Sequence, residues 1–340
     1  MIQKKLSYKE VESARRMLES CRKVAIVCHT SPDGDAIGSS LALYEYLKDM
    51  GKTVSVVVPG YFPDFLHWMT DSDKIVMYDK QRAMGNLLLS QADLICVLDL
   101  NDPGRLEDLG RAVERSTAKK LMIDHHLDPV RFCDLTISYP QASSTCELVF
   151  RLIYAMGGER HLTKAGAEDI YAGMCTDTGR FSYNSNDPDI FIIIAELLKK
   201  GIDKDKIVRN IYNNYTEQRF RLLGHILKDK LEVYAEQHAC LYHVTRAEQS
   251  EYHFLKGDLE GVVNLPLEIR GVTMSISLRE DTEKDRIMVS VRTVDDKPAN
   301  LIAEKYFNGG GHLNAAGGML WCGMDEALDI ARKAIKDNEF

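Results

Sequence analysis

The chain has 340 residues, of which 45% are apolar and 28% are charged, and its formal net charge is −8. This composition excludes a disordered or low-complexity chain, and at about 150 residues per domain the length predicts two domains. The acidic balance argues against stable binding of long nucleic acids, which needs an excess of lysine and arginine.

No run approaches the roughly 18 consecutive apolar residues of a membrane helix, and the start of the chain lacks the apolar centre of a signal peptide. The sequence therefore predicts a cytoplasmic protein without membrane association. The eight cysteines form no Cys-x-x-Cys pair, and several lie in apolar runs. We expect reduced core thiols, neither disulfides nor zinc ligands.

In the first half of the chain, short apolar runs alternate with helical patterns. Strands that are apolar on both faces indicate a mostly parallel sheet with helices on both faces. Such a sheet binds ligands beyond the carboxyl ends of its strands, so polar residues at these ends are the first candidates for a site. Strands are predicted at 23–29, 53–60, 93–100 and 120–126, and a helix at 37–51.

The pattern changes twice in the second half. It is mainly helical from about 143 to 228, and after about Lys230 it turns to strand pairs, a helix at 299–307, a glycine cluster and a last helix. The predicted fold class is thus α/β, with a parallel sheet followed by helices and a smaller α+β C-terminal domain. The expected division is an N-terminal domain at 1–205, a helical linker at 206–231 and a C-terminal domain at 232–340.

The loop after the first predicted strand, HTSPDGD, contains His29, Asp33 and Asp35. Two aspartates two residues apart in an extended loop can point the same way, and hard divalent cations prefer carboxylate oxygens. An added histidine nitrogen favours Mn²⁺ or a similar metal over Ca²⁺. The alternative is an ordinary turn in which Asp33 or Asp35 caps the next helix.

Two other strand ends carry polar residues. Asp99 lies at the end of an apolar run, where a charge is costly unless it is paired or bound to metal, although it could also cap the following helix. Asp124, His125 and His126 follow another apolar run and offer a carboxylate and two imidazoles at one point of the sheet edge. The alternative for this pair is two surface histidines in a turn.

Asp177 lies between two threonines near the end of a helical run, and by itself it would be a capping or turn residue. Four segments in this order, HTSPDGDAIGS, LDL, IDHH and CTDTG, resemble the motifs of the DHH phosphoesterases. This family includes RecJ-like exonucleases, family II pyrophosphatases and small enzymes that degrade very short oligonucleotides. The glycine-rich NGGGHLNAAGG resembles the signature of the DHH-associated domain, so 1–205 would be the catalytic domain and 232–340 the substrate-binding domain.

The resemblance implies a pair of divalent cations, Mn²⁺ with Mg²⁺ or Co²⁺ as alternatives. Charge balance supports this number, because four clustered aspartates would repel one another without cations. Two cations close together can activate a water for attack on phosphorus and stabilise the developing charge. In the family pattern His29 and Asp33 hold one metal, Asp35, His125 and Asp177 hold the other, and Asp99 bridges both.

The same pattern gives His126 a catalytic role facing the substrate, with Asp124 supporting the histidine pair. Ser144 would lie near the active site together with Thr145, but both could equally cap the helix that follows. Arg105 and Arg292 match arginines of the family and would clamp phosphate, although Arg279 competes with Arg292 for this role.

The glycine cluster Gly309, Gly310 and Gly311 exposes backbone N–H groups that suit close contact with phosphate or a base, and His312 adds a donor. The alternative is a tight loop between two elements. The chain has Asn308 where a fourth glycine is common in the family. No GxxxxGK[ST] motif exists, which excludes a P-loop.

The resemblance to stand-alone bacterial enzymes implies hydrolysis of short oligoribonucleotides to mononucleotides and dephosphorylation of 3'-phosphoadenosine 5'-phosphate. A short substrate agrees with the acidic net charge. The alternatives are a phosphodiesterase acting on cyclic or linear dinucleotides, a polyphosphatase, and a nucleotide sensor that has lost catalysis. A homodimer is one possibility, because the helical stretch 143–228 has enough apolar surface to serve either a core or a dimer.

Overall fold

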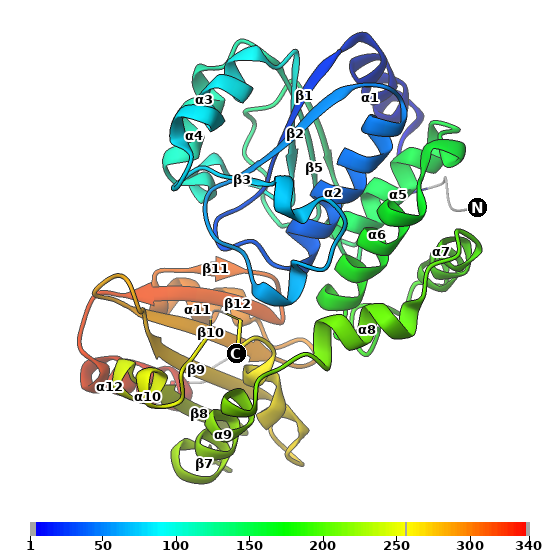
Figure 1. Cartoon of the computed structure of the whole chain (residues 1–340). Helices are drawn as coiled ribbons and strands as arrows, with labels where there is room; N and C mark the ends of the chain where they lie inside the picture. The colour runs from blue at the N-terminus through cyan, green and yellow to red at the C-terminus, as the bar shows by residue number, and fades with distance from the viewer. Residues whose placement is uncertain (1–4, 256, 338–340) are drawn as a thin grey trace. The chain divides into compact units, whose positions relative to one another are not determined.

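The computed structural model describes residues 5–255 and 257–337. The chain divides into two compact units, with the boundary between Asn214 and Tyr215 (Figure 1). None of the described helices is long and apolar enough to cross a membrane.

The first unit is built on a six-stranded parallel sheet with the strand order β3-β2-β1-β4-β5-β6, which confirms the predicted sheet. The central strands are buried on both faces because helices cover both of them. The strands are β1 (Lys23–Val27), β2 (Thr53–Val58), β3 (Val76–Met77), β4 (Leu94–Leu98), β5 (Lys119–Asp124) and β6 (Leu135–Ser138).

Two apolar clusters lie on opposite faces of this sheet. The larger cluster contains side chains of α1, α2, α5 and α6, whereas α3 and α4 contribute to the smaller one (Figure 1). The predicted helix at 37–51 begins three residues earlier than expected, because Asp33 caps it. The helices are α1 (Tyr8–Ser20), α2 (Gly34–Asp49), α3 (Arg82–Gln91), α4 (Asp108–Arg115), α5 (Thr145–Ala155), α6 (Lys164–Asp177), α7 (Pro188–Lys199) and α8 (Lys204–Tyr212).

Helices α2 and α6 approach each other closely through glycines. A Cβ atom on Gly34 would collide with the side chain of Thr176, and one on Gly38 would lie 2.7 Å from the carbonyl oxygen of Asp169. Such close contact requires the absence of side chains at these positions. The start of α2 is thereby held against the end of α6.

The second unit contains a mixed sheet with the strand order β11-β12-β10-β9-β8-β7, in which only the β8–β9 pair is parallel. Helices α11 and α12 pack on one face, and α9 with the adjoining turn contributes to a smaller apolar cluster. Its elements are α9 (Glu217–His225), β7 (Glu232–Tyr234), β8 (Ala239–Val244), α10 (Arg246–Glu251), β9 (Met274–Glu280), β10 (Ile287–Thr293), α11 (Ala299–Phe307), β11 (Gly310–Gly311), β12 (Ala315–Leu320) and α12 (Met324–Lys336).

The predicted α+β C-terminal part is thus confirmed. The expected linker at 206–231 contains the end of α8, all of α9 and the π-helical turn Ile226–Lys230. Its exact limits stay a prediction.

Candidate functional site

The strand order of the first unit reverses between β1 and β4, which are neighbours in the sheet although they are far apart in sequence. In sheets of this kind, the crevice at the carboxyl ends of two such strands is the usual place for a ligand. His29 follows β1 and Asp99 follows β4, so both residues lie at this crevice.

Asp33 has two roles at the start of α2. Its Oδ1 atom accepts hydrogen bonds of 3.0 Å from the backbone N–H groups of Asp35 and Ala36, which makes it the N-cap. Its Oδ2 atom lies 3.9 Å from Nε2 of His29. Asp33 therefore caps α2, and its second oxygen is turned toward the crevice, so the cap does not exclude a role in metal binding.

His29, Asp33 and Asp99 form the first group of side chains whose ligand atoms lie together. Nε2 of His29 is 3.3 Å from Oδ2 of Asp99. Nδ1 of His29 is 2.8 Å from the carbonyl oxygen of Thr30, so this nitrogen carries the proton and donates it. Nε2 is thereby turned toward the carboxylates, the orientation that metal-binding histidines adopt.

Asp35, His125 and Asp177 form the second group. Nε2 of His125 lies 3.2 Å from Oδ2 of Asp177 and 3.8 Å from Oδ2 of Asp35. Its Nδ1 atom is 3.3 Å from the carbonyl oxygen of Ala142, which again directs Nε2 toward the carboxylates. This group joins residues from α2, α6 and the end of β5.

Asp99 lies between the two groups. Its Oδ2 atom faces His29, and its Oδ1 atom is 3.5 Å from Nε2 of His125. The residue has a φ of 54°, in the left-handed region that is strained for an aspartate. The backbone thus carries local strain at the point from which this carboxylate reaches both groups.

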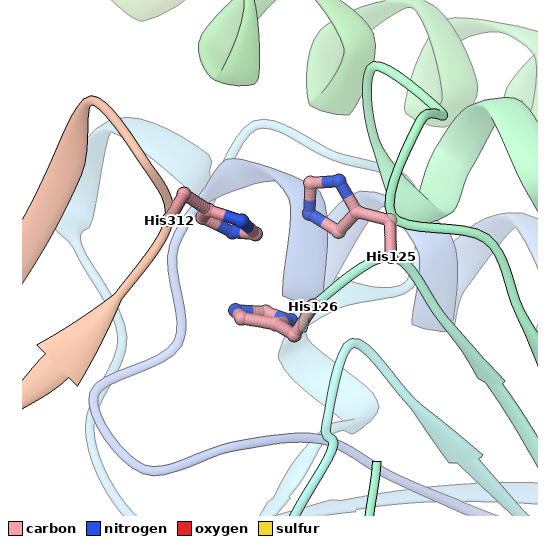
Figure 2. A group of neighbouring side chains, drawn as sticks. All are labelled: His125, His126 and His312. Atoms are coloured by element: carbon pink, nitrogen blue, oxygen red, sulfur yellow. The ribbon is translucent and has the colours of Figure 1, made fainter. Parts of the chain in front are cut away.

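His126 is oriented by Asp124. Nδ1 of His126 is 2.8 Å from Oδ1 of Asp124, and the backbone N–H of His126 donates to the other oxygen at 3.2 Å. The rings of His125 and His126 project from the end of β5 with their planes inclined at 72° (Figure 2). The two neighbouring imidazoles therefore point in different directions.

The first turn of α5 binds two of the aspartates. The backbone N–H groups of Thr145 and Cys146 donate to the two oxygens of Asp35 at 2.6 and 2.8 Å, and the Thr145 hydroxyl donates to Oδ1 of Asp99 at 2.9 Å. A helix N-terminus stabilises a carboxylate through such N–H groups and through the helix dipole. The sequence places Thr145 near the site but does not indicate that it joins Asp35 to Asp99.

Ser144 is fully buried, and its hydroxyl accepts a hydrogen bond from the backbone N–H of Glu147. This arrangement favours the capping alternative for Ser144 over contact with a substrate. Glu147 also accepts from Ser143 at 2.7 Å and from the buried Arg151 at 2.7 Å. Sequence reasoning missed this pair, for which the i, i+4 spacing of opposite charges on one helix is the available signal.

The buried charges strongly shift one another's pKa. Burial and the charges of Asp99 and Asp177 raise the pKa of Asp35 well above its usual value. Burial also raises the pKa of Asp177 to about 6, although His125 opposes the shift. Burial disfavours protonation of His125, but the hydrogen bond and charge of Asp177 outweigh it and raise its pKa.

The pKa of Asp99 moves the other way. Burial works against its ionisation, yet the hydrogen bond from His29 and the neighbouring imidazoles hold its pKa well below the usual range. The group as a whole therefore retains protons to balance its negative charge. Four carboxylates and two suitably oriented imidazole nitrogens are a donor set that fits divalent cations in place of those protons.

Arg105 belongs to the 3₁₀ turn Pro103–Leu106 between β4 and α4. Its guanidinium donates to Oδ1 of Asn101 at 3.2 Å, and its carbonyl oxygen accepts from the backbone N–H of Thr30 at 2.8 Å. It is half-buried. Burial and, to a smaller extent, the charge of Arg105 oppose protonation of His29, but Asp99 and Asp33 outweigh them and raise its pKa. The structure thus brings Arg105 to the same crevice.

The other predicted substrate residues belong to the second unit. The guanidinium of Arg292 on β10 donates to the carbonyl oxygens of Val291 and Ala316 at 3.0 and 3.3 Å. Arg279 on β9 lies with its guanidinium carbon 5.6 Å from the ring centre of Phe254. His312, also drawn in Figure 2, lies in the turn between β11 and β12, where its backbone N–H donates to Ala315.

The three glycines of the cluster have different structural constraints. A Cβ on Gly309 would collide with the carbonyl oxygen of Gly317, and one on Gly311 would lie 2.6 Å from that of Ala315. Close packing against β12 therefore explains these two positions. On Gly310 the nearest atom would be Oε1 of Glu304 at 3.9 Å, so packing within the chain does not require a glycine there.

The fold and the site define an α/β protein with a cluster of aspartates and histidines of metal-binding type at the switch point of a parallel sheet. Residues 23–174 match the model of the DHH family, N-terminal domain, and residues 242–337 match the DHHA1 domain. The chain belongs to the DHH family. The first match includes five of the six predicted metal ligands, and Asp177 lies three residues beyond its end.

An exopolyphosphatase-related protein from Bacteroides fragilis has a crystal structure with 48% sequence identity and a TM-score of 0.93, covering 98% of this chain and 97% of that one. The bifunctional oligoribonuclease and PAP phosphatase NrnA of Thermus thermophilus is 29% identical over 92% of this chain and 89% of its own length. The cyclic-di-AMP phosphodiesterase PdeA of Listeria monocytogenes is 25% identical, and the match covers 46% of that protein. Exonuclease RecJ bound to manganese shares the fold, with 15% identity and a TM-score of 0.54.

Proposed function

We propose that this chain is a metal-dependent phosphoesterase that hydrolyses short oligoribonucleotides to mononucleotides and dephosphorylates 3'-phosphoadenosine 5'-phosphate. One observation carries the proposal: the two oxygens of Asp99 face two separate groups of histidine and aspartate, with His126 beside them. The likeness to the NrnA of Thermus thermophilus over most of both chains supports the choice of substrates.

The proposed cations are a pair of Mn²⁺ ions, with Mg²⁺ or Co²⁺ as alternatives. When bound, such a pair supplies an activated water and neutralises charge on the phosphate. Histidine nitrogen among the carboxylate oxygens favours Mn²⁺. His29 and Asp33 would hold one ion, Asp35, His125 and Asp177 the other, and Asp99 would contribute one oxygen to each.

His126 is the proposed proton donor. Oδ1 of Asp124 lies 2.8 Å from its Nδ1 atom, which fixes the orientation of the ring. In this proposal the ring donates a hydrogen bond to a phosphate oxygen or protonates the leaving oxygen. Asp124 is fully buried, so its part is to orient His126.

Arg105 is the proposed clamp on the phosphate, since a guanidinium fork binds two phosphate oxygens at once. In the second unit Arg292, Gly309, Gly310, Gly311 and His312 are the proposed nucleotide-binding residues. Among the glycines, Gly310 has the strongest case, because nothing in its own unit explains the missing side chain.

A second candidate is a phosphodiesterase acting on cyclic or linear dinucleotides, favoured by the likeness to PdeA of Listeria monocytogenes. A third candidate is a polyphosphatase, because the Bacteroides fragilis protein is called exopolyphosphatase-related. The complete set of metal-binding side chains argues against a catalytically inactive sensor. A cytoplasmic location and a homodimer stay predictions.

The test is turnover of four substrates with Mn²⁺: a labelled five-nucleotide RNA, 3'-phosphoadenosine 5'-phosphate, a cyclic dinucleotide and polyphosphate. We expect mononucleotides from the RNA and inorganic phosphate from the bisphosphorylated adenosine. Consumption of polyphosphate alone, or of the cyclic dinucleotide alone, would replace the proposal by the corresponding alternative.

A further inference from the structure

A polar groove of about 600 Å³ separates helices α3 and α4 on one face of the parallel sheet. Adjacent helices of such a fold usually bury apolar side chains between them, but Asn86, Ser116 and Thr117 are among the residues that line this gap. Arg82 and Asp108, the first residues of α3 and α4, lie at one end of it. Both helices follow a parallel strand, so this end lies at the carboxyl edge of the sheet, the edge that bears the candidate site.

Three arginines give the groove its charge: Arg82 on α3, and Arg111 and Arg115 on α4. Arg82 forms an ion pair with Asp108, and its guanidinium carbon lies 5.4 Å from the ring centre of Tyr78, so it is held in place. The groove therefore carries two positive charges in excess, on a chain whose net charge is −8.

Arg111 and Arg115 carry this excess. They are four residues apart, which places two like charges side by side on one face of α4. Over residues 5–255 and 257–337 neither guanidinium forms an ion pair, and Glu114 between them does not line the groove. An anion in the groove would remove their repulsion.

The donors of the groove select the kind of anion. Its guanidinium forks, amide and hydroxyl groups match the oxygens of phosphate, to which arginine binds bidentately. Arg111 and Arg115 are separated by about 6 Å along the helix axis, since each residue rises about 1.5 Å. This separation suits successive phosphates of an extended strand better than a single small anion.

We propose that the α3–α4 groove binds phosphate groups, and that its occupant is the part of a short oligoribonucleotide that extends beyond the reacting phosphate. Arg105 lies in the turn that leads into α4, so it continues the arginines of the groove toward the crevice of His29 and Asp99. The identity of the strand rests on the proposed function. Binding of phosphate groups in the groove does not.

The test compares Arg111→Gln/Arg115→Gln with Arg16→Gln/Arg22→Gln. Both double variants remove two positive charges from exposed arginines, and Arg16 on α1 and Arg22 lie outside the groove. Binding of a fluorescent five-nucleotide RNA and of inorganic tripolyphosphate is measured in EDTA, where no turnover occurs. Turnover with Mn²⁺ is then compared for the five-nucleotide RNA and a dinucleotide.

We expect the groove variant to bind the five-nucleotide RNA about tenfold more weakly and to reduce the slope of log affinity against log salt by about 1.4, or about 0.7 for each lost phosphate contact. Its kcat/KM should fall for the longer RNA and stay unchanged for the dinucleotide, and the control variant should resemble the wild type.

Two results would overturn the inference in different ways. Weaker binding of tripolyphosphate with unchanged binding of the RNA would keep a phosphate site but reject the strand as its occupant. Unchanged binding of both probes would reject the phosphate site itself. If the wild type binds RNA through the groove but hydrolyses neither the five-nucleotide RNA nor the dinucleotide, the proposed function is wrong, whereas the phosphate site in the groove is retained.

Discussion

The Thr145 hydroxyl donates a 2.9 Å hydrogen bond to Oδ1 of Asp99, while the backbone N–H of the same residue donates to Asp35. Thr145→Val keeps the shape and the backbone N–H and removes only the hydroxyl. We expect Mn²⁺ affinity and kcat/KM to fall by about 10- to 100-fold, the usual effect of losing a partner of a metal ligand. Calorimetry of Mn²⁺ binding and steady-state kinetics measure the two quantities.

Thr145→Ser is the matched control, since it retains the hydroxyl and should bind Mn²⁺ nearly as the wild type does. Equal Mn²⁺ affinity in the valine and serine variants would show that the hydrogen bond to Asp99 does not position this carboxylate for a cation.

Asp99→Ala removes the carboxylate that faces both His29 and His125. Without it neither group keeps its full set of donors, so we expect turnover to be lost and the number of bound Mn²⁺ ions to fall from two to one. Metal analysis after equilibrium dialysis counts the ions. A variant that still binds two ions and turns over substrate at the wild-type rate would remove the bridging role from Asp99.

Gly310→Ala tests whether the glycine cluster contacts a ligand. An added methyl group has room within the second unit, so thermal stability should be unchanged, whereas a backbone in contact with phosphate or a base would be obstructed. We expect KM to rise by about tenfold with no loss of melting temperature. Gly309→Ala is the contrasting variant: it should lower the melting temperature, because its Cβ collides with β12. An unchanged KM in Gly310→Ala would show that the glycine cluster is a structural turn without contact to the ligand.

Asp169 on α6 is 1% exposed, and both of its carboxylate oxygens lack a hydrogen-bond partner among the described residues. Burial, with the charges of Glu45 and Glu168, raises its pKa well above the usual value. The folded chain therefore binds a proton at Asp169 more tightly than the unfolded chain does. The stability of the fold falls as the pH rises above about 4, the pKa of an aspartate in the unfolded chain, toward the raised pKa in the folded chain.

Asp169→Asn removes this titration. We expect its free energy of unfolding at pH 8 to exceed that of the wild type by about 1–3 kcal/mol, and the difference to shrink toward pH 4. Urea unfolding across this pH range measures it, and Glu236→Gln, at an exposed residue of the second unit whose charge does not act on Asp169, should show no such trend. The idea fails if the asparagine variant is no more stable at pH 8 than at pH 4, each relative to the wild type.

Much of the fold and of the site could be predicted because both depend on short-range patterns. Apolar runs locate the strands, and parallel strands bring their carboxyl ends to one edge, so the sequence alone could place Asp99 beside Asp33 and Asp35. The choice of His125 over His126 came from the resemblance to the family. Asp177 could not be placed in this way, since it comes from the end of a helix. Only the resemblance to the family assigned it.

The contacts between distant segments could not be predicted. Nothing in the residues around Thr145 says that its N–H group meets Asp35, which is 110 positions earlier. A helix N-cap and a metal ligand call for the same residue types, so the sequence offers Asp33 as either. In the structure one of its oxygens caps α2 and the other faces His29. The spacing of Arg82 and Arg111 gives no sign that they share a groove.

The glycine contact between α2 and α6 bears on the size of cation that the proposed site would accept. Helices that touch backbone to backbone cannot shift apart or together easily, so Asp35 and Asp177 are set at a fixed span. His29 belongs to the segment between β1 and α2, and Asp33 caps α2. If the proposed cations bind, the group of Asp35, His125 and Asp177 should therefore tolerate a change of ionic radius poorly. Replacing a small cation by a larger one should then weaken binding at this group first.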